Sequence, residues 1–418
     1  MLTLLGINKI LAIYVGPAGY AALGQFQNAV LMISTLASGA INTGVTKYTA
    51  EYQDDEAQQR KVWQTAGTIA LTGSLMLSVL VFIFREQLAL GFLGDASLST
   101  VFVWFAATLV LFVFNTLLLA ILNGKKDIRR YVLANISGSV FALAITALMV
   151  VKWGLLGALI ALAVYQSLAF FATLFLCLRT PWFRWRELVG AVDLPVAKNL
   201  AKYTAMALTT AATVPLSHIL IRNHLGHTLG WEAAGYWEAM WRLSGAYLML
   251  VSTTLSVYYL PRLSELQTGD EIRKEVLSGY QVILPVAVVG AVLVYFLRDF
   301  IIVTLFSPAF RPMEALFFWQ LIGDVLKIAS WLFAFVMVGK SMTSLFIVSE
   351  LVFSLSFYLL TIFATERTGL QGVTMAYAAN YLVYLVLMAY LINRKIESMK
   401  PTLSDAQRLK VKDQETEI

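Results

Sequence analysis

Residues 101–122 read VFVWFAATLVLFVFNTLLLAIL and contain no charged side chain. A helix on the surface of a soluble protein carries charged residues along its solvent-facing side, and this segment offers none. At 1.5 Å per residue, a helix of this length crosses a hydrocarbon core of about 30 Å. The segment therefore predicts a transmembrane helix.

The rest of the chain repeats this pattern. Of its 418 residues, 59% are hydrophobic and 13% are charged, whereas about a quarter of the residues of soluble domains are charged. Only α-helices and closed β-barrels satisfy their backbone hydrogen bonds in lipid. No segment alternates like a barrel strand, so the spans are predicted to be α-helices. We predict an all-α integral membrane protein with twelve transmembrane helices, near residues 1–15, 27–47, 63–84, 101–122, 131–151, 155–177, 203–222, 234–260, 280–297, 315–338, 343–363 and 370–392.

The basic residues indicate how the chain is oriented. The net charge is +6, but most of the 31 Lys and Arg residues lie in alternate loops and in the tail after Arg394. This distribution is typical of cytoplasmic loops and does not suggest nucleic-acid binding. It predicts a multi-pass membrane protein with both termini in the cytoplasm. The single cysteine, Cys177, excludes an intramolecular disulfide.

The two halves of the chain resemble one another. Matched positions recur in the same order, namely Trp104 with Trp319, Gly124-Lys125 with Gly339-Lys340, and Gly154 to Gly157 with Gly369 to Gly372. Six helices per unit make the repeats parallel rather than inverted. We predict two six-helix lobes, 1–187 and 188–395, followed by a charged cytoplasmic tail, 396–418. Against the second repeat, the first helix is expected to be shortened at its start.

Charged residues fall inside several predicted spans, where each needs a partner, a cavity or a function. The bases are Lys9, Arg222, Arg242 and Lys327. The acids are Glu238, Asp324 and Glu350, and His218 lies near the end of the seventh span. Glu238 and Arg242 share a helix face, as do Asp324 and Lys327, and His218 and Arg222. Such pairs either neutralise each other to ease insertion or line a cavity that binds an anion, the Arg as a bidentate fork and the Lys as a point charge. Asp324, Glu350 and His218 are candidates for coupling transport to protons.

Polar and aromatic stripes give a second set of candidates. Asn28, Thr35, Asn42 and Thr46 follow one face of the second span, and Tyr377, Asn380, Tyr381 and Tyr384 follow one face of the last. Trp237 and Trp241 flank Glu238. These side chains either join helices and anchor them at the interface, or face a cavity in which they contact sugar hydroxyls and rings.

Enzyme signatures are lacking. The sequence shows no glycine-rich phosphate loop, no metal-ligand spacing among its three histidines and no nucleophile constellation. The longest loop, 178–202, is too short for a catalytic domain. We expect a protein that is not an enzyme and that needs no metal or cofactor.

Several stretches carry a family resemblance: GPAGYAALGQFQN at 16–28, INTGVTKYTAEY at 41–52, YTAMALTTAATVPLSHILIRN at 203–223, YYLPRLSEL at 258–266 and WQLIGDVLKIASWLFAFVMVGK at 319–340. They resemble the Wzx-type flippases of the multidrug/oligosaccharidyl-lipid/polysaccharide exporter superfamily, which move O-antigen units or the lipid III of enterobacterial common antigen. The resemblance extends from Gly16 to Arg394. It departs from the family pattern at the short first helix and the longer charged tail.

The resemblance implies a two-lobe transporter of the bacterial inner membrane that works by alternating access. Its substrate would be a polyprenyl-pyrophosphate-linked glycan whose lipid tail stays in the bilayer, and the polymerase and chain-length machinery of glycan assembly would be further partners. A buried pyrophosphate needs matched cations, which Lys9, Arg222, Arg242 and Lys327 would supply.

Three alternative functions remain to be compared with the sequence. A multidrug or cation antiporter of the same superfamily should have a net acidic interior, and here four bases face three acids. A membrane enzyme of glycan assembly lacks a catalytic cluster. A transport-inactive scaffold of that machinery would be compatible with a shortened first helix.

Overall fold

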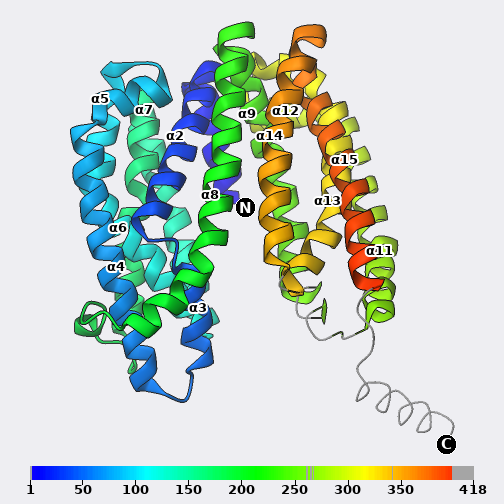
Figure 1. Cartoon of the computed structure of the whole chain (residues 1–418). Helices are drawn as coiled ribbons and strands as arrows, with labels where there is room; N and C mark the ends of the chain where they lie inside the picture. The colour runs from blue at the N-terminus through cyan, green and yellow to red at the C-terminus, as the bar shows by residue number, and fades with distance from the viewer. Residues whose placement is uncertain (1, 260–261, 264–265, 267, 341, 398–418) are drawn as a thin grey trace, which may run out of the picture. The chain divides into compact units, whose positions relative to one another are not determined.

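The protein is described by a computed structural model that covers residues 2–259, 262–263, 266, 268–340 and 342–397 (Figure 1). The predicted tail, 396–418, lies outside the described residues from position 398 onward. Every regular element within the described ranges is helical, which confirms the all-α prediction. The elements are α1 (Leu2–Tyr14), α2 (Gly16–Ala37), α3 (Asn42–Glu51), α4 (Glu56–Ile83), α5 (Arg85–Leu88), η1 (Ala89–Leu93), η2 (Ala96–Leu98), α6 (Ser99–Gly124), α7 (Ile128–Leu178), η3 (Trp185–Glu187), α8 (Leu194–Leu229), α9 (Trp231–Thr254), η4 (Leu255–Tyr259), α11 (Gly269–Phe296), α12 (Arg298–Leu305), η5 (Pro308–Leu316), α13 (Phe317–Gly339), α14 (Thr343–Thr368) and α15 (Gln371–Glu397).

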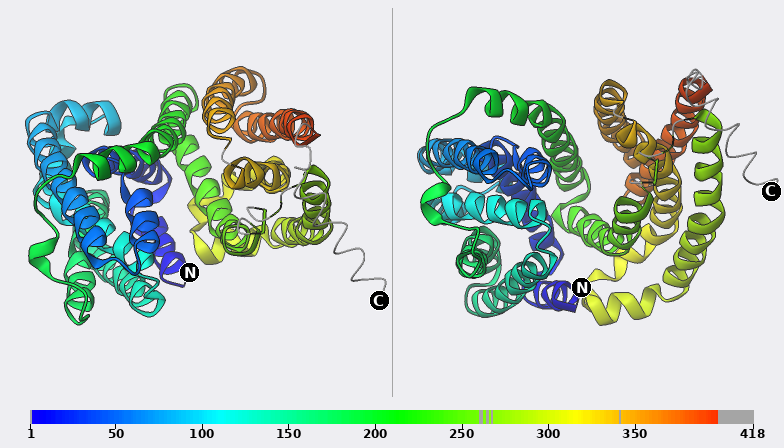
Figure 2. Two further views of the ribbon diagram at one scale, coloured as in Figure 1. Left: turned by 60° about the horizontal axis from the view of Figure 1, so that its bottom comes forward. Right: turned by 90° about the horizontal axis from the view of Figure 1, so that it is seen from below.

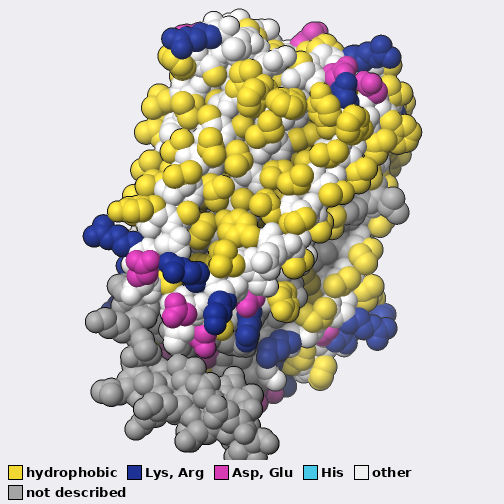
Figure 3. Space-filling model, turned by 90° about the vertical axis from the view of Figure 1, so that its right-hand side faces the viewer, with side chains coloured by type: hydrophobic (Ala, Val, Ile, Leu, Met, Phe, Trp, Pro, Cys, Tyr) yellow, Lys and Arg dark blue, Asp and Glu magenta, His cyan; other side chains and the backbone are white. Residues whose placement is uncertain are grey.

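The long helices have the length and apolar surface of membrane spans. Within the described residues, seven helices qualify, or up to eight if α2 and α3, which meet at 49°, form one broken span. Figure 3 shows the surface on the α11 and α15 side as a broad apolar area bordered by charged side chains. On α11, Val286 is 70% exposed and Phe296 is 75% exposed. Side chains of this kind are stable at a surface only where lipid covers it.

The helices form two compact units. The first contains Met1–Ala239 and Phe300–Pro312, and the second contains Met240–Asp299 and Met313–Ile418. Helix α8 packs against α2, α3 and α4, so it belongs to the first unit although the sequence repeat assigns it to the second half. The lobe boundary at 187/188 stays a prediction from the sequence repeat, whereas the compact units divide at 239/240, 299/300 and 312/313.

The second unit is built around α13. This helix packs against α11 and α15, and α14 packs against α15, as the views in Figure 2 show. The buried core contains Leu332 and Val336 of α13 together with Met388 and Ile392 of α15. These apolar positions recur every three to four residues along each helix, which is the spacing of one buried helix face.

The second predicted span, 27–47, is wrong at its start and in its continuity. Helix α2 begins at Gly16 and has a proline in its first turn. Proline has no backbone N–H to donate, and N–H groups in the first turn have no acceptor within the helix. The helix then stops at Ala37, and Gly39 and Ala40 adopt left-handed φ values of 65° and 52° before α3 begins. The segment 16–26, which the predicted spans 1–15 and 27–47 leave out, is helical, and Tyr20, Leu23 and Phe26 within it are buried.

Helix α7 bends sharply at Gly154, where φ is 53° and ψ is −128°. A methyl group at Gly157 would lie 2.0 Å from the carbonyl oxygen of Met149. In a straight helix, residues eight apart are about 12 Å apart along the axis, so the chain turns back at this point. Residues 128–153 and 155–178 are thus two helical segments joined by a tight turn, as predicted for spans 131–151 and 155–177.

The turn between α14 and α15 has the same backbone geometry. Gly369 has a φ of 62° and a ψ of −141°, and a methyl group at Gly372 would lie 2.6 Å from the carbonyl oxygen of Ala364, again eight residues earlier. These glycines occupy the positions that the sequence repeat pairs with Gly154 and Gly157. The shared geometry explains why both turns need glycine at the same two places.

Candidate functional site

Arg222 lies in a buried network of the first unit. The side chain is 2% exposed, and its Nε and NH2 atoms each lie 2.9 Å from Oε2 of Glu238 on α9. NH1 donates to the side-chain oxygen of Gln25 on α2 at 3.0 Å. When the Asn28 amide is turned with its oxygen toward the guanidinium, that oxygen accepts from both NH1 and NH2 at 3.1 Å. Gly24 leaves the space that the Glu238 carboxylate occupies, because a methyl group at Gly24 would lie 2.3 Å from this carboxylate.

This network adds a partner that the sequence spacing did not suggest. The predicted pairing of Glu238 with Arg242 stays a prediction, and the Glu238 carboxylate binds Arg222 from α8, a neighbour that spacing within α9 does not reveal. The positive charge of Arg222 is thereby neutralised within α2, α8 and α9. Trp237 is fully buried and contacts the ring of His218 edge-on at 5.5 Å between centroids. The guanidinium of Arg222 lies over the Trp237 ring at 5.5 Å.

Lys9 binds the end of another helix of the first unit. Its ammonium donates to the carbonyl oxygens of Val303 at 2.7 Å and Phe306 at 2.6 Å. These carbonyls terminate α12, where the helix leaves acceptors without intrahelical partners and where its dipole favours a cation. The segment that contains α12 is far from Lys9 in the sequence, so the sequence did not indicate this contact.

In the second unit, Lys327 of α13 lies among aromatic rings. Its ammonium nitrogen is 4.9 Å from the ring centroid of Trp241, 5.3 Å from that of Tyr381, 5.7 Å from that of Trp331 and 5.8 Å from that of Tyr377. We call these four rings the aromatic box. Ring faces attract a cation without neutralising its charge. The box thus surrounds a positive charge within an apolar helix with ring faces, and the carboxylates of Asp324 and Glu350 also act on that charge.

Asp324, one turn before Lys327, is held by neutral donors. Its Oδ2 atom accepts from the Ser244 hydroxyl at 2.7 Å and from the Tyr247 hydroxyl. Its Oδ1 atom accepts from the Tyr377 hydroxyl at 2.9 Å and from the Gln320 amide at 3.3 Å. The carboxylate therefore ties α9, α13 and α15 together, and Tyr377 takes part in both this cluster and the aromatic box.

The remaining sequence candidates of the second unit have different surroundings. Asn380 accepts from Ser356 at 2.5 Å and donates to the carbonyl of Phe353 at 3.2 Å, so it joins α15 to α14. Glu350 of α14 is half-buried, and its charge acts on Lys327. Arg242 is half-buried on α9.

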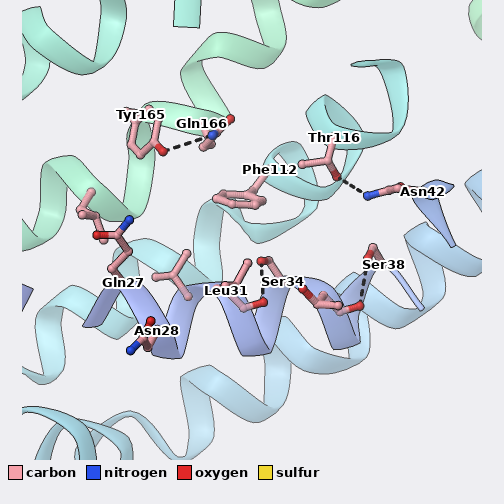
Figure 4. Close-up of a pocket in the computed structure, with 13 residues that line it drawn as sticks. Gln27, Asn28, Leu31, Ser34, Ser38, Asn42, Phe112, Thr116, Tyr165 and Gln166 are labelled. Carbon is pink, nitrogen blue, oxygen red and sulfur yellow. Dashed lines mark hydrogen bonds between the residues drawn. The ribbon is translucent and has the colours of Figure 1, made fainter. Parts of the chain in front are cut away.

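A polar pocket of about 390 Å³ lies in the first unit beside the break between α2 and α3. Figure 4 shows side chains of α2, α6 and α7 around it, with Phe112 among the polar groups. None of the lining side chains is charged. They are Gln27, Asn28, Val30, Leu31, Ser34, Thr35, Ser38, Asn42, Phe112, Thr116, Leu162, Tyr165 and Gln166.

Hydrogen bonds within the protein determine what this pocket offers to a ligand. The hydroxyls of Ser34, Ser38 and Thr116 each donate to the backbone carbonyl three residues earlier, at 3.2, 2.9 and 2.8 Å. Their oxygens are left as acceptors. The Asn42 amide donates to Thr116 at 3.3 Å, and among the described residues its buried Oδ1 atom has no donor. Asn28, Thr35 and Asn42 of the predicted stripe line this pocket. The rest of the polar lining includes side chains of α6 and α7, which spacing along one helix cannot reveal.

A second pocket, of about 420 Å³, lies between α9, α11 and α13 of the second unit. Its walls are almost entirely apolar, and Gly290 leaves space on the α11 side. Tyr247 and Asp324 line its polar end.

Comparisons with known proteins agree on one family. Residues 2–267 match the model of a family described as polysaccharide biosynthesis protein. The lipid III flippases of Escherichia coli (strain K12) and Shigella flexneri are each 31% identical over 384 residues, which cover 91% of this chain and 92% of each relative.

Solved structures show the same fold. An inward-facing multidrug resistance MATE family transporter of the MOP superfamily aligns with a TM-score of 0.81 at 15% identity, with 96% of both chains covered. The lipid II flippase MurJ, in an inward closed conformation, aligns with a TM-score of 0.69 at 13% identity over 94% of this chain and 85% of MurJ. All of these proteins are transporters or flippases, not enzymes. With its all-helical MATE-like fold and its match over most of the chain, this multi-pass membrane protein belongs to the polysaccharide biosynthesis protein family.

Proposed function

We propose that the protein is a flippase that moves an undecaprenyl-pyrophosphate-linked oligosaccharide from the cytoplasmic to the periplasmic leaflet of the bacterial inner membrane. The identity to lipid III flippases favours the lipid III of enterobacterial common antigen, and an O-antigen unit is the next substrate to consider. The glycan would cross by alternating access while the polyprenyl chain remains in lipid.

The observation that carries this proposal is Lys327 in its aromatic box. A diphosphate brings about two negative charges into a low-dielectric site, where each needs a cation. Lys327 has a positive charge that four rings hold in place, and Arg242 of the same unit supplies the second. Lys9 and Arg222 were also predicted to bind the diphosphate. Their hydrogen bonds to helix-end carbonyls and to Glu238 instead support structural roles.

The arrangement of spans forms part of the proposal. Counting α2 with α3 as one span and α7 as two, the helices α1, α2/α3, α4, α6, the two segments of α7, α8, α9, α11, α13, α14 and α15 provide twelve crossings in two repeats. The basic loops place both termini in the cytoplasm. The polymerase and chain-length proteins of glycan assembly would receive the product and are the expected protein partners.

An organic-cation antiporter is the second candidate, because aromatic boxes also bind cationic ligands. In this protein the box is occupied by Lys327 itself, and the Asp324 carboxylate is occupied by neutral donors. A cationic drug would have to displace the ammonium, which disfavours this function.

Complementation tests the proposal directly. The gene is expressed in strains that lack either the lipid III flippase or an O-antigen flippase, and surface glycan is measured for each. Restoration in either strain supports a flippase and identifies its glycan. Failure in both strains, together with increased resistance to cationic drugs, would favour the antiporter.

A further inference from the structure

The uncharged pocket beside the α2–α3 break offers a ligand different chemical groups from those of the aromatic box. Its lining combines amides, hydroxyls and two aromatic rings, Phe112 and Tyr165, and it has no cation. A phosphate or carboxylate buried there would lack the paired charge that burial requires. The pocket therefore cannot serve the anionic part of a lipid-linked glycan.

The direction of the hydrogen bonds further restricts the classes of ligand that can bind in the pocket. Ser34 and Ser38 are 7% and 3% exposed, and their hydroxyl protons are committed to the carbonyls of Leu31 and Thr35. Each hydroxyl oxygen keeps acceptor capacity. With the hydroxyl oxygen of Thr116, the pocket presents acceptors that a ligand rich in O–H and N–H donors would satisfy. Phosphate oxygens, which only accept, would leave these groups unsatisfied.

A further hydrogen-bond chain orients the opposite wall. Thr173 donates to Oδ1 of Asn115 at 2.7 Å, and the Asn115 amide donates to Oε1 of Gln166 at 2.9 Å. The Gln166 amide in turn donates to the hydroxyl oxygen of Tyr165 at 3.1 Å. This relay fixes the amide orientation of Gln166 and places the Tyr165 hydroxyl at the pocket (Figure 4). A polar network that is satisfied and pre-oriented is rigid, so it needs little rearrangement when a ligand binds.

We propose that this pocket binds an uncharged sugar unit of the transported glycan, with Ser34, Ser38 and Thr116 accepting hydrogen bonds from its hydroxyl or N-acetyl N–H groups. The volume of about 390 Å³ is in the range of small-molecule sites and suits one or two sugar rings. Phe112 and Tyr165 offer apolar faces for the C–H side of a ring. The inference rests on the proposed flippase function and adds where, and to which part of the substrate, the first unit binds.

The first test uses the full-length protein in nanodiscs and ligand-observed NMR with three probes: a neutral di-N-acetylhexosamine, a hexuronate-containing disaccharide and inorganic pyrophosphate. The neutral disaccharide is expected to bind at least about tenfold more tightly than the hexuronate disaccharide, because the pocket would bury the carboxylate without a cation. Pyrophosphate is expected not to displace the neutral disaccharide. Equal binding of the two disaccharides, or displacement by pyrophosphate, would overturn the proposal. This comparison needs no variant.

Variants then locate the site. Ser34→Ala and Thr116→Val each remove one acceptor and should weaken binding of the neutral disaccharide roughly fivefold. The matched control is Ser74→Ala on α4, since Ser74 is also buried and also donates to the carbonyl three residues earlier, but does not line the pocket. The control should bind like the wild type. If the two pocket variants also bind like the wild type, the pocket assignment is wrong.

The same variants separate this inference from the proposed function. If the wild type restores glycan export and the pocket variants bind and export normally, the pocket inference fails and the flippase function stands. If the wild type exports no glycan in any complemented strain, the flippase function fails whether or not the disaccharide binds in the pocket.

Discussion

At the residue scale, Lys327 and Asp324 lie one turn apart on α13 and have different tasks. Lys327 contacts ring faces, which hold its charge without cancelling it. Asp324 is 1% exposed and accepts four hydrogen bonds from three helices. The first side chain is suited to binding an anion and the second to fixing the helices around it.

Substitutions should separate these two tasks. Lys327→Met keeps the side-chain length and removes the charge, so we expect loss of glycan export with membrane abundance and thermal stability near those of the wild type. Asp324→Ala leaves buried donors without an acceptor and should lower the free energy of unfolding by about 2–4 kcal/mol. Surface glycan and thermal unfolding of the purified protein are the two measurements. Normal export by Lys327→Met would contradict the anion-binding role.

The Arg222–Glu238 ion pair provides a second test at this scale. Both groups are buried, so removing one partner leaves an uncompensated charge and should cost about 3–5 kcal/mol. The double variant Arg222→Met/Glu238→Gln removes both charges and should recover most of the stability and of the export. A double variant that is stable but transports nothing would show that Arg222 itself binds substrate.

At the element scale, two glycine turns define where helices reverse. Gly154 and Gly369 share a backbone conformation that a side chain rarely adopts. Gly154→Ala and Gly369→Ala should therefore each destabilise the protein by about 1–3 kcal/mol. Gly138→Ala, within the regular part of α7, is the control, because its methyl group would make ordinary contact with Ala169 at 3.4 Å. Thermal unfolding of the three variants makes the comparison. If all three unfold at the same temperature, α7 does not reverse at Gly154.

The break between α2 and α3 is a second feature at this scale. It ends one helix at Ala37 and starts the next at Asn42, with the polar pocket beside it. In lipid, an interrupted helix is tolerated only where its polar backbone groups face protein or a cavity. Here the Gly39 carbonyl accepts from Thr204 of α8 at 3.0 Å. Helix α8, which packs against α2 and α3, thus satisfies one backbone group at the break.

At the scale of the whole molecule, topology follows from the distribution of basic loops. We expect reporter fusions after Lys125 and Arg394 to be active in the cytoplasm and a fusion after Gly94 to be active in the periplasm. The physical cause is the retention of Lys- and Arg-rich loops on the cytoplasmic side. A periplasmic signal from the fusion after Arg394 would contradict an even number of spans with both termini inside.

The sequence by itself determined the class of the protein. Uncharged segments such as 101–122 can be stable only as helices in lipid, so the all-helical membrane fold follows from composition and segment length. The paired glycines at 154 and 369 marked equivalent turns, and the structure places the same backbone geometry at both. The motifs at 16–28 and 319–340 identified the family.

Only the tertiary structure decided which partner each charged or polar side chain has. Spacing along a helix reveals neighbours on that helix, and so it paired Glu238 with Arg242 and Asp324 with Lys327. The structure adds partners from other helices: Arg222 for Glu238, Tyr377 for Asp324, and the α12 carbonyls for Lys9. Burial rewards any nearby group that satisfies a charge or hydrogen bond, whatever its distance along the chain. For the same reason the acceptor-lined pocket became visible only once α2, α6 and α7 were packed together.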